Sequence, residues 1–94
     1  MKKLKEIKKK TWPEYFELIK SGKKNFEIRL ADFDIKEGDL LVLEEYNPKT
    51  KQYTGRSIKK KVSLIKNTKM MEKMHKKEDI EKYGLYVIGI EDVK

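Results

Sequence analysis

Cysteine is absent from the sequence, so neither a disulfide nor a thiolate metal site can form. No apolar run comes near the roughly 18 residues that a membrane-spanning helix needs. The first ten residues, MKKLKEIKKK, lack the apolar stretch of a secretory signal peptide. We therefore expect a cytoplasmic protein that makes no contact with a membrane.

Motifs for cofactor and metal chemistry are missing as well. The sequence has no Gly-rich phosphate loop, no HExxH zinc motif and no G-x-S-x-G nucleophile motif. His75 is the single histidine, and no Asp or Cys stands at ligand spacing from it. We therefore expect no metal site and no cofactor.

Acidic residues are too few to balance the basic ones, and the net charge is +8. The excess is uneven: residues 56–77 hold nine Lys or Arg against Glu72 alone, whereas residues 32–45 hold six Asp or Glu against Lys36 alone. Such a distribution favours a polyanion, such as RNA or DNA, on one face. A general enrichment of lysine on every surface is the alternative, and charge by itself does not decide between the two.

Arginine is scarce among the basic residues, because 22 of the 24 are lysine. The two arginines are Arg29 and Arg56. A guanidinium offers a planar fork of donors that an ammonium cannot supply, so both positions are candidate ligand-binding residues. On the segment that contains Arg56, three consecutive lysines are candidates for phosphate contacts: Lys59, Lys60 and Lys61.

A chain of 94 residues forms one domain with a modest core, so we assign residues 1–94 to a single domain. Hydrophobic periodicity predicts a mainly β protein with short helices. Strands are expected at about residues 2–9, 26–30, 40–46, 53–65 and 85–90, with a turn at residues 47–50. Residues 66–83 fit either a short helix or a charged loop. Five short strands suit a small closed or half-closed barrel, because closure removes open sheet edges.

A helix is expected over about residues 12–21. Thr11 fits an N-cap and Glu14 completes a capping box, while Pro13 is tolerated in the first turn. Gly22 stands where a left-handed C-cap is expected. Four residues at helical spacing predict an apolar, core-packed stripe, with ligand contact as the alternative for the first two: Trp12, Tyr15, Phe16 and Ile19.

The stretch SGKKNFEIRL, residues 21–30, changes the period from 3.6 to 2. One face of this strand is apolar and is expected to face the core: Phe26, Ile28 and Leu30. Glu27 and Arg29 share the opposite face. The preceding helix and turn can wall a cleft over that polar face, with Lys23 or Lys24 at its mouth. The alternative is a solvated Glu–Arg pair worth about a few tenths of a kcal/mol.

Residues 22–29 read G-K-K-N-F-E-I-R and resemble the G-x-K-x-x-E-x-R motif of the ASCH (activating-signal-cointegrator homology) superfamily. The surrounding segments are similar to a phage and bacterial branch of that superfamily whose function is unknown. They carry its W-P-x-Y-F helix, its G-D-x-L-x-L-x-E-[YW] strand, its Y-T-G-R return strand and a closing G-L-Y-V-I-G-I-E strand. The similarity covers nearly the whole chain except residues 66–83.

The resemblance implies a PUA-like β-barrel of five to six strands, a fold associated with RNA binding. It also implies a cleft beside the first helix, lined by Lys24, Glu27 and Arg29 with Trp12 and Tyr15 nearby. In one enzymatic relative, an acetylcytidine amidohydrolase, a threonine thought to be the nucleophile stands at the position of Glu27; other relatives are ribonucleases. A glutamate cannot take that acyl-transfer role, so the resemblance implies the cleft and not the amidase activity.

The sequence thus predicts a module that binds RNA or a nucleotide-like ligand in this cleft. An alternative is a small hydrolase acting on RNA or a modified nucleoside, with Lys24 as the acid–base or electrostatic group and Glu27 as the general base. A charged Arg29 next to Glu27 favours the ionised carboxylate and works against that role. A protein–protein adaptor is the third alternative, and neither the ligand nor the oligomeric state follows from the sequence.

Overall fold

A computed structural model describes residues 4–68 and 84–93 of the chain. Within these residues the elements are β1 (Glu6–Thr11), α1 (Pro13–Lys20), β2 (Phe26–Leu30), β3 (Leu40–Asn47), β4 (Gln52–Asn67) and β5 (Leu85–Asp92). The predicted mainly β class with a helix near the N-terminus is therefore confirmed. No helix of the described part is long and apolar enough to cross a bilayer. Most of the segment 66–83, for which two alternatives were open, lies outside the described residues.

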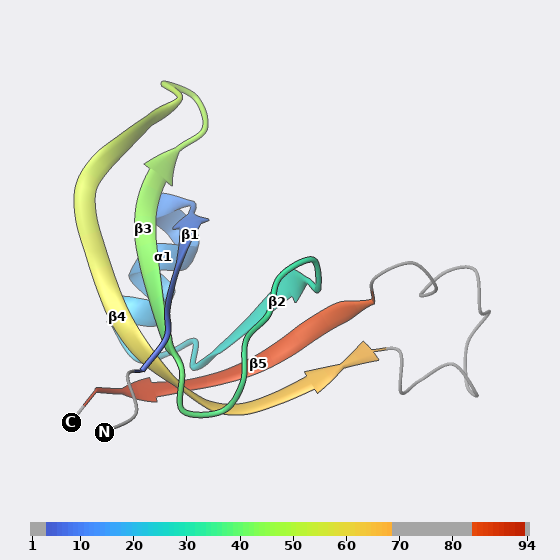
Figure 1. Cartoon of the computed structure of the whole chain (residues 1–94). Coiled ribbons are helices and arrows are strands. Elements are labelled where there is room, and N and C mark those ends of the chain that lie inside the picture. The colour runs from blue at the N-terminus through green and yellow to red at the C-terminus, as the bar shows by residue number, and fades with distance from the viewer. Residues whose placement is uncertain (1–3, 69–83, 94) are drawn as a thin grey trace.

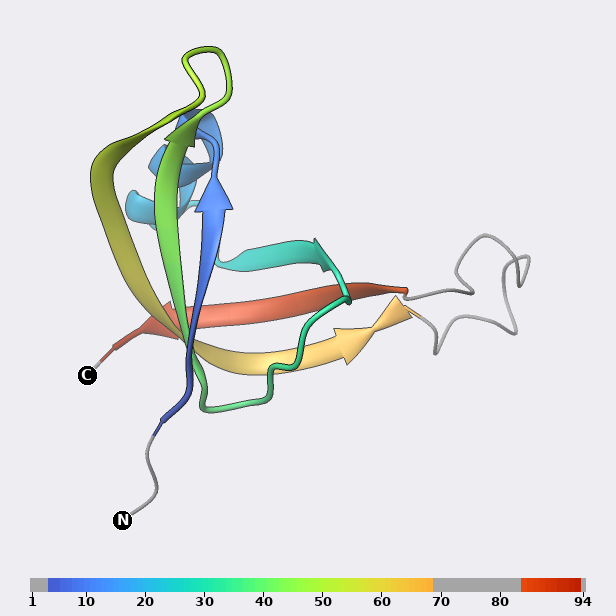
Figure 2. The ribbon, with the colours of Figure 1, turned by 45° about the horizontal axis from the view of Figure 1, so that its top comes forward.

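All five strands belong to one curled sheet, in the order β1-β3-β4-β5-β2. β1 runs parallel to β3, and the other neighbours are antiparallel. Figures 1 and 2 show that the long strand β4 bends and is shared by two wings of the sheet. One wing holds β1, β3 and the first part of β4, and the other holds the rest of β4, β5 and β2. The result is a half-barrel with β1 and β2 as its edges.

The helix begins one residue later than the capping-box pattern predicts. Its N-cap is Trp12, which makes no side-chain capping hydrogen bond, and Pro13 follows in the first turn. The prediction of Thr11 as the N-cap is therefore wrong. Thr11 ends β1, and its buried hydroxyl accepts a hydrogen bond from Arg29 instead. Beyond the helix Gly22 has φ 84°, which confirms the predicted left-handed turn.

The core lies between α1 and the inner face of the sheet. Phe16 and Ile19 are the buried residues of α1. The predicted strand at about 40–46 is β3, and both Leu41 and Leu43 in it are fully covered. One contiguous cluster joins the helix to three strands: Ile19, Leu41, Leu43, Val62, Ile88 and Ile90.

β2 turns its apolar residues to solvent, so the prediction that Phe26, Ile28 and Leu30 face the core is wrong. Residues directly opposite each other in an antiparallel pair point to the same face. The register of β2 with β5 places Glu27 opposite Ile88 and Ile28 opposite Val87. Ile88 is buried, and Glu27 is accordingly only 3% exposed, whereas Ile28 is 55% exposed. The polar face of β2 is its inner face.

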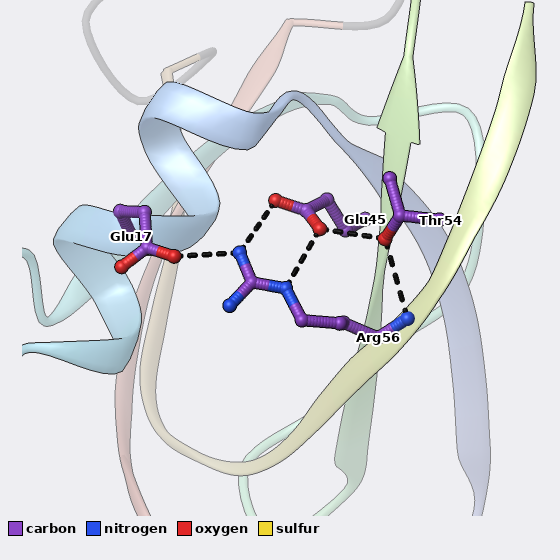
Figure 3. A network of polar contacts seen from close by, with 4 residues as sticks. All are labelled: Glu17, Glu45, Thr54 and Arg56. Carbon is purple, nitrogen blue, oxygen red and sulfur yellow. Dashed lines mark hydrogen bonds and ion pairs between the residues drawn. The ribbon is translucent and has the colours of Figure 1, made fainter.

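Arg56 of β4 fastens the β3–β4 hairpin to α1, as Figure 3 shows. Its Nε and Nη2 atoms donate to the two carboxylate oxygens of Glu45, each at 2.8 Å, and Nη2 also donates to Glu17 of the helix. The Thr54 hydroxyl donates to Glu45 at 2.6 Å. The Arg56 hydrogen bond is the largest of the causes that lower the pKa of the buried Glu45 carboxyl from 4.5 to about 2.

The reversed face of β2 predicts opposite outcomes for one substitution made on two neighbouring strands. Ile88→Ala removes a side chain that is 0% exposed and should lower the free energy of unfolding by about 2–5 kcal/mol. Ile28→Ala, at 55% exposure, should lower it by less than about 1 kcal/mol. Urea denaturation followed by Trp12 fluorescence measures both. Equal losses would contradict the observed orientation of β2.

The Glu45–Arg56 contact predicts a specific pH dependence of stability. Because the pKa of Glu45 is lower in the folded chain, its stabilisation is fully present above pH 4.5 and is lost as the pH falls towards 2. Glu45→Gln should therefore cost about 1–3 kcal/mol at pH 7, and less at each lower pH within that window. Urea denaturation of both proteins between pH 7 and pH 3 measures the difference. Glu44→Gln, next to it in β3, is the control and should have a small effect on stability.

Candidate functional site

A cleft of about 460 Å³ opens where the two edge strands of the half-barrel approach the helix. The end of β1 supplies Lys10 and Thr11, and the start of α1 supplies Trp12 and Tyr15. The third side consists of Lys24 and residues 26–29 of β2. The cleft thus lies between the two sheet edges, beside the first helix, and the G-x-K-x-x-E-x-R segment forms one of its walls.

The buried carboxylate of Glu27 organises this wall. Its Oε1 atom accepts a hydrogen bond from Lys24 Nζ at 2.8 Å, and its Oε2 atom accepts one from Arg29 Nε at 2.7 Å. Arg29 Nη2 then donates to the Thr11 hydroxyl at 3.1 Å. Glu27, Arg29 and Thr11 therefore connect edge strand β2 with edge strand β1 through side chains.

Both cations reach the cleft with part of their hydrogen-bonding capacity still available. The Lys24 and Arg29 side chains are 18% and 22% exposed, whereas that of Glu27 is 4% exposed. A guanidinium has five N–H donors, and the described residues accept from two of those of Arg29, one on Nε and one on Nη2. The outer donors of Arg29 and the remaining protons of Lys24 can therefore bind an anionic or carbonyl oxygen.

The backbone holds Lys24 in place. Its amide donates to the carbonyl oxygen of Leu18 at 2.9 Å, so the residue is attached to the last turn of α1. Its ammonium lies 5.1 Å from the centre of the Phe26 ring and 5.7 Å from that of Tyr15. The motif lysine is thus fixed between the helix and β2.

Two aromatic rings at the start of α1 line the cleft, so the default expectation that they pack in the core is wrong. Trp12 and Tyr15 are 49% and 46% exposed, and both line the cleft. Their ring centres lie 6.4 Å apart with an angle of 29° between the planes. The alternative that they contact a ligand stays a prediction.

The other lysines singled out in the sequence lie elsewhere. Lys23 is exposed but does not line the cleft. Lys59 and Lys61 are exposed on β4, where Lys59 pairs with Glu6 at 3.1 Å. Lys60 points the opposite way, is 9% exposed and donates to Asp92 at 2.6 Å. The period of 2 along a strand thus divides the basic run between two faces.

Arg56 lies beside a second hollow of about 370 Å³ rather than beside the cleft. Phe16 and Lys20 also line this hollow. Hydrogen bonds to the carboxylates of Glu45 and, to a lesser extent, Glu17 neutralise the Arg56 guanidinium and raise its pKa. The position of Arg56 therefore indicates a structural role for the arginine that the sequence suggested as a ligand-binding residue.

Four residues of the cleft escaped the reasoning from sequence: Phe26 and Ile28, which were expected to face the core, and Lys10 and Thr11. Thr11 was interpreted as a helix cap because the local pattern T-W-P-E fits one, and its partner Arg29 lies 18 residues away. Lys10 is one of six lysines in the first ten residues, and nothing local distinguishes it. Among residues 4–68 and 84–93, no group of three His, Cys, Asp or Glu could hold a metal ion. His75 lies outside these ranges.

Comparison with known proteins adds a family and a structure. Residues 6–77 match DUF3850, a domain of unknown function. The chain is also similar to the crystal structure of hypothetical protein PH0355, with a TM-score of 0.64 and 27% sequence identity over 94% of this chain and 99% of that chain. No curated protein sequence shows significant similarity to the chain.

The burial of Glu27 predicts that its carboxylate matters for stability as well as for the cleft. Glu27→Gln leaves Lys24 and Arg29 without an anion and should lower the free energy of unfolding by about 1–3 kcal/mol. Glu6→Gln breaks a solvated ion pair with Lys59 and should cost about 0–1 kcal/mol. Chemical denaturation at low and high salt measures both changes. A Glu27 effect no larger than that of Glu6 would show that the cluster contributes only as a surface contact.

Proposed function

The chain belongs to the DUF3850 family, and we propose that it is a binding module of the ASCH type that holds RNA or a nucleotide-like ligand in the cleft between β1, α1 and β2. The fold proposed with this function is PUA-like, which agrees with the observed half-barrel of five strands and its N-terminal helix. The ligand makes polar contacts with Lys24 and Arg29, and a flat ring of the ligand lies against the exposed aromatic rings.

One observation carries this proposal: two cations held by Glu27 and two exposed aromatic rings line the same cleft, which has the size of a ligand. A volume of about 460 Å³ lies in the range of small-molecule sites. Arginine and lysine donors suit phosphate or carbonyl oxygens, and Trp or Tyr rings suit the π-face of a base. A nucleotide combines these two chemistries in one small molecule.

The geometry favours binding over hydrolysis. A general base needs an oxygen within reach of the proton that it abstracts. Each carboxylate oxygen of Glu27 already accepts a hydrogen bond from a cation, and the carboxylate is buried behind them. Glu27 is therefore placed to orient Lys24 and Arg29 rather than to meet a substrate.

The proposal predicts different effects for two adjacent lysines of the same charge. Lys24→Ala removes a cleft donor and should weaken ligand binding by about tenfold or more, whereas Lys23→Ala, outside the cleft, should change it less than about twofold. Arg29→Lys should also weaken binding by about tenfold, because an ammonium cannot hold both Glu27 and a ligand in the same plane. Calorimetric titration with AMP, CMP, GMP, UMP and acetylcytidine measures these changes.

Amide NMR spectra serve as the control for folding in each variant. Perturbed peaks should cluster at the end of β1, the start of α1 and β2 in the wild-type titration. Equal losses in the two lysine variants would replace a specific site with a general charge effect. If none of the nucleotides and no RNA binds at low salt, the proposed function is overturned. If the wild type turns over a ligand and Glu27→Gln abolishes this turnover, the hydrolase is favoured.

A further inference from the structure

A second group of aromatic and basic side chains lies next to the cleft, close to the turn of the β3–β4 hairpin. Tyr46 and Tyr53 are opposite each other in the two strands, with ring centres 5.2 Å apart and planes at 68°. The Lys10 ammonium lies 4.3 Å from the centre of the Tyr46 ring and 5.7 Å from that of Tyr53. Tyr53 is 53% exposed, so one large ring of this group is open to a partner.

Lys10 connects this group to the cleft. It is on edge strand β1, directly before Thr11, and it lines the cleft as well as covering the Tyr46 ring. No carboxylate of the described residues lies within ion-pair distance of its ammonium, unlike those of Lys24 and Lys59. Its charge is therefore available to a ligand between the cleft and the Tyr46–Tyr53 pair.

The hairpin beyond the tyrosines carries only positive charge. Residues 47–55, NPKTKQYTG, contain Lys49 and Lys51 and no acidic residue. The turn itself is well formed, because Asn47 Oδ1 accepts from the Lys49 amide at 2.9 Å and the Lys51 amide donates to the Asn47 carbonyl at 2.8 Å. The two turn lysines are exposed next to Tyr53.

We propose that the cleft and the Lys10–Tyr46–Tyr53 group form one continuous path for a single strand of nucleic acid. This inference rests on the proposed function and adds its ligand class. One nucleotide occupies the cleft and contacts both the exposed rings at the start of α1 and the Lys24–Arg29 pair. The adjacent nucleotide stacks its base on Tyr53, and Lys10 contacts the phosphate between the two.

The arrangement of the groups is what makes a single strand the fitting ligand. Stacking platforms alternating with cations are the means by which proteins hold unpaired strands, since every base has a π-face and every nucleotide has a phosphate. A base within a duplex exposes no such face to a tyrosine ring. A surface that binds only phosphates needs cations alone, so the exposed Tyr53 ring beside Lys10 favours a ligand that also presents a base.

The test compares one nucleotide with five. Binding of UMP and of fluorescein-labelled single-stranded pentanucleotides, as RNA and as DNA, is measured by calorimetry and by fluorescence anisotropy. The pentanucleotides should bind at least about tenfold more tightly than UMP. Tyr53→Ala should weaken their binding by about five- to a hundredfold and leave UMP binding unchanged within about twofold. Tyr53→Phe, which keeps the ring, should bind like the wild type.

Two further readouts keep the test decisive if Tyr53→Ala folds poorly. In the wild type, the amide peaks of Tyr46 and Tyr53 should shift with the pentanucleotides and not with UMP. Lys10→Gln should reduce the salt dependence of pentanucleotide binding by about one in the log–log slope.

The possible failures are distinguishable. Three results would overturn this inference and leave the mononucleotide site standing. The pentanucleotides bind no more tightly than UMP, a duplex of the same length binds with equal affinity, or the amide peaks of Tyr46 and Tyr53 do not shift. If the wild-type protein binds neither UMP nor any oligonucleotide, the proposed function itself is overturned. A preference between the RNA and DNA arms identifies the natural strand, and either preference supports the path.

Discussion

The buried carboxylate of Glu27 is the interaction on which the open side of this half-barrel depends. A closed barrel joins its first and last strands by backbone hydrogen bonds, whereas the two edge strands here face each other across a cleft. Glu27 holds Arg29, and Arg29 reaches the Thr11 hydroxyl on the opposite edge. A charged side chain can span a gap that a backbone ladder cannot. The same contact that steadies the two edges also leaves room for a ligand between them.

The two arginines of the chain illustrate how carboxylate partners decide what a guanidinium can do. Arg56 contacts Glu45, Glu17 and the Phe16 ring, so its charge is balanced within the fold and joins the helix to the hairpin. Arg29 shares a single carboxylate with Lys24, which leaves an excess of positive charge in the cleft. The net charge of this small cluster, rather than that of the whole protein, favours an anion at this place.

Reasoning from sequence succeeded where the local pattern determines the structure. Neighbouring residues alone predict the strand at about 40–46, the turn at Asn47 and the left-handed Gly22. The orientation of β2 could not be obtained in this way, because a period of 2 states which residues share a face and not which face is covered. That choice depends on Ile88, about sixty residues further along the chain. Pairing Glu27 with two cations made the burial of its polar face tolerable. The local pattern and the resemblance both predicted a cleft beside the helix, whereas neither indicated the hydrogen bond from Arg29 to Thr11, which joins residues 18 positions apart.

The pairing of β2 with β5 has a consequence for the order in which the molecule is assembled. β2 has one strand neighbour in the sheet, and that neighbour, Leu85–Asp92, is made last of all the described strands. During synthesis on the ribosome the helix, β3 and β4 emerge while β2 still has no strand to pair with. Contacts of such large sequence separation form late and slow the folding of small β proteins. The cleft wall is therefore among the last of the described parts to become native, and a nascent chain acquires it only when β5 has left the exit tunnel.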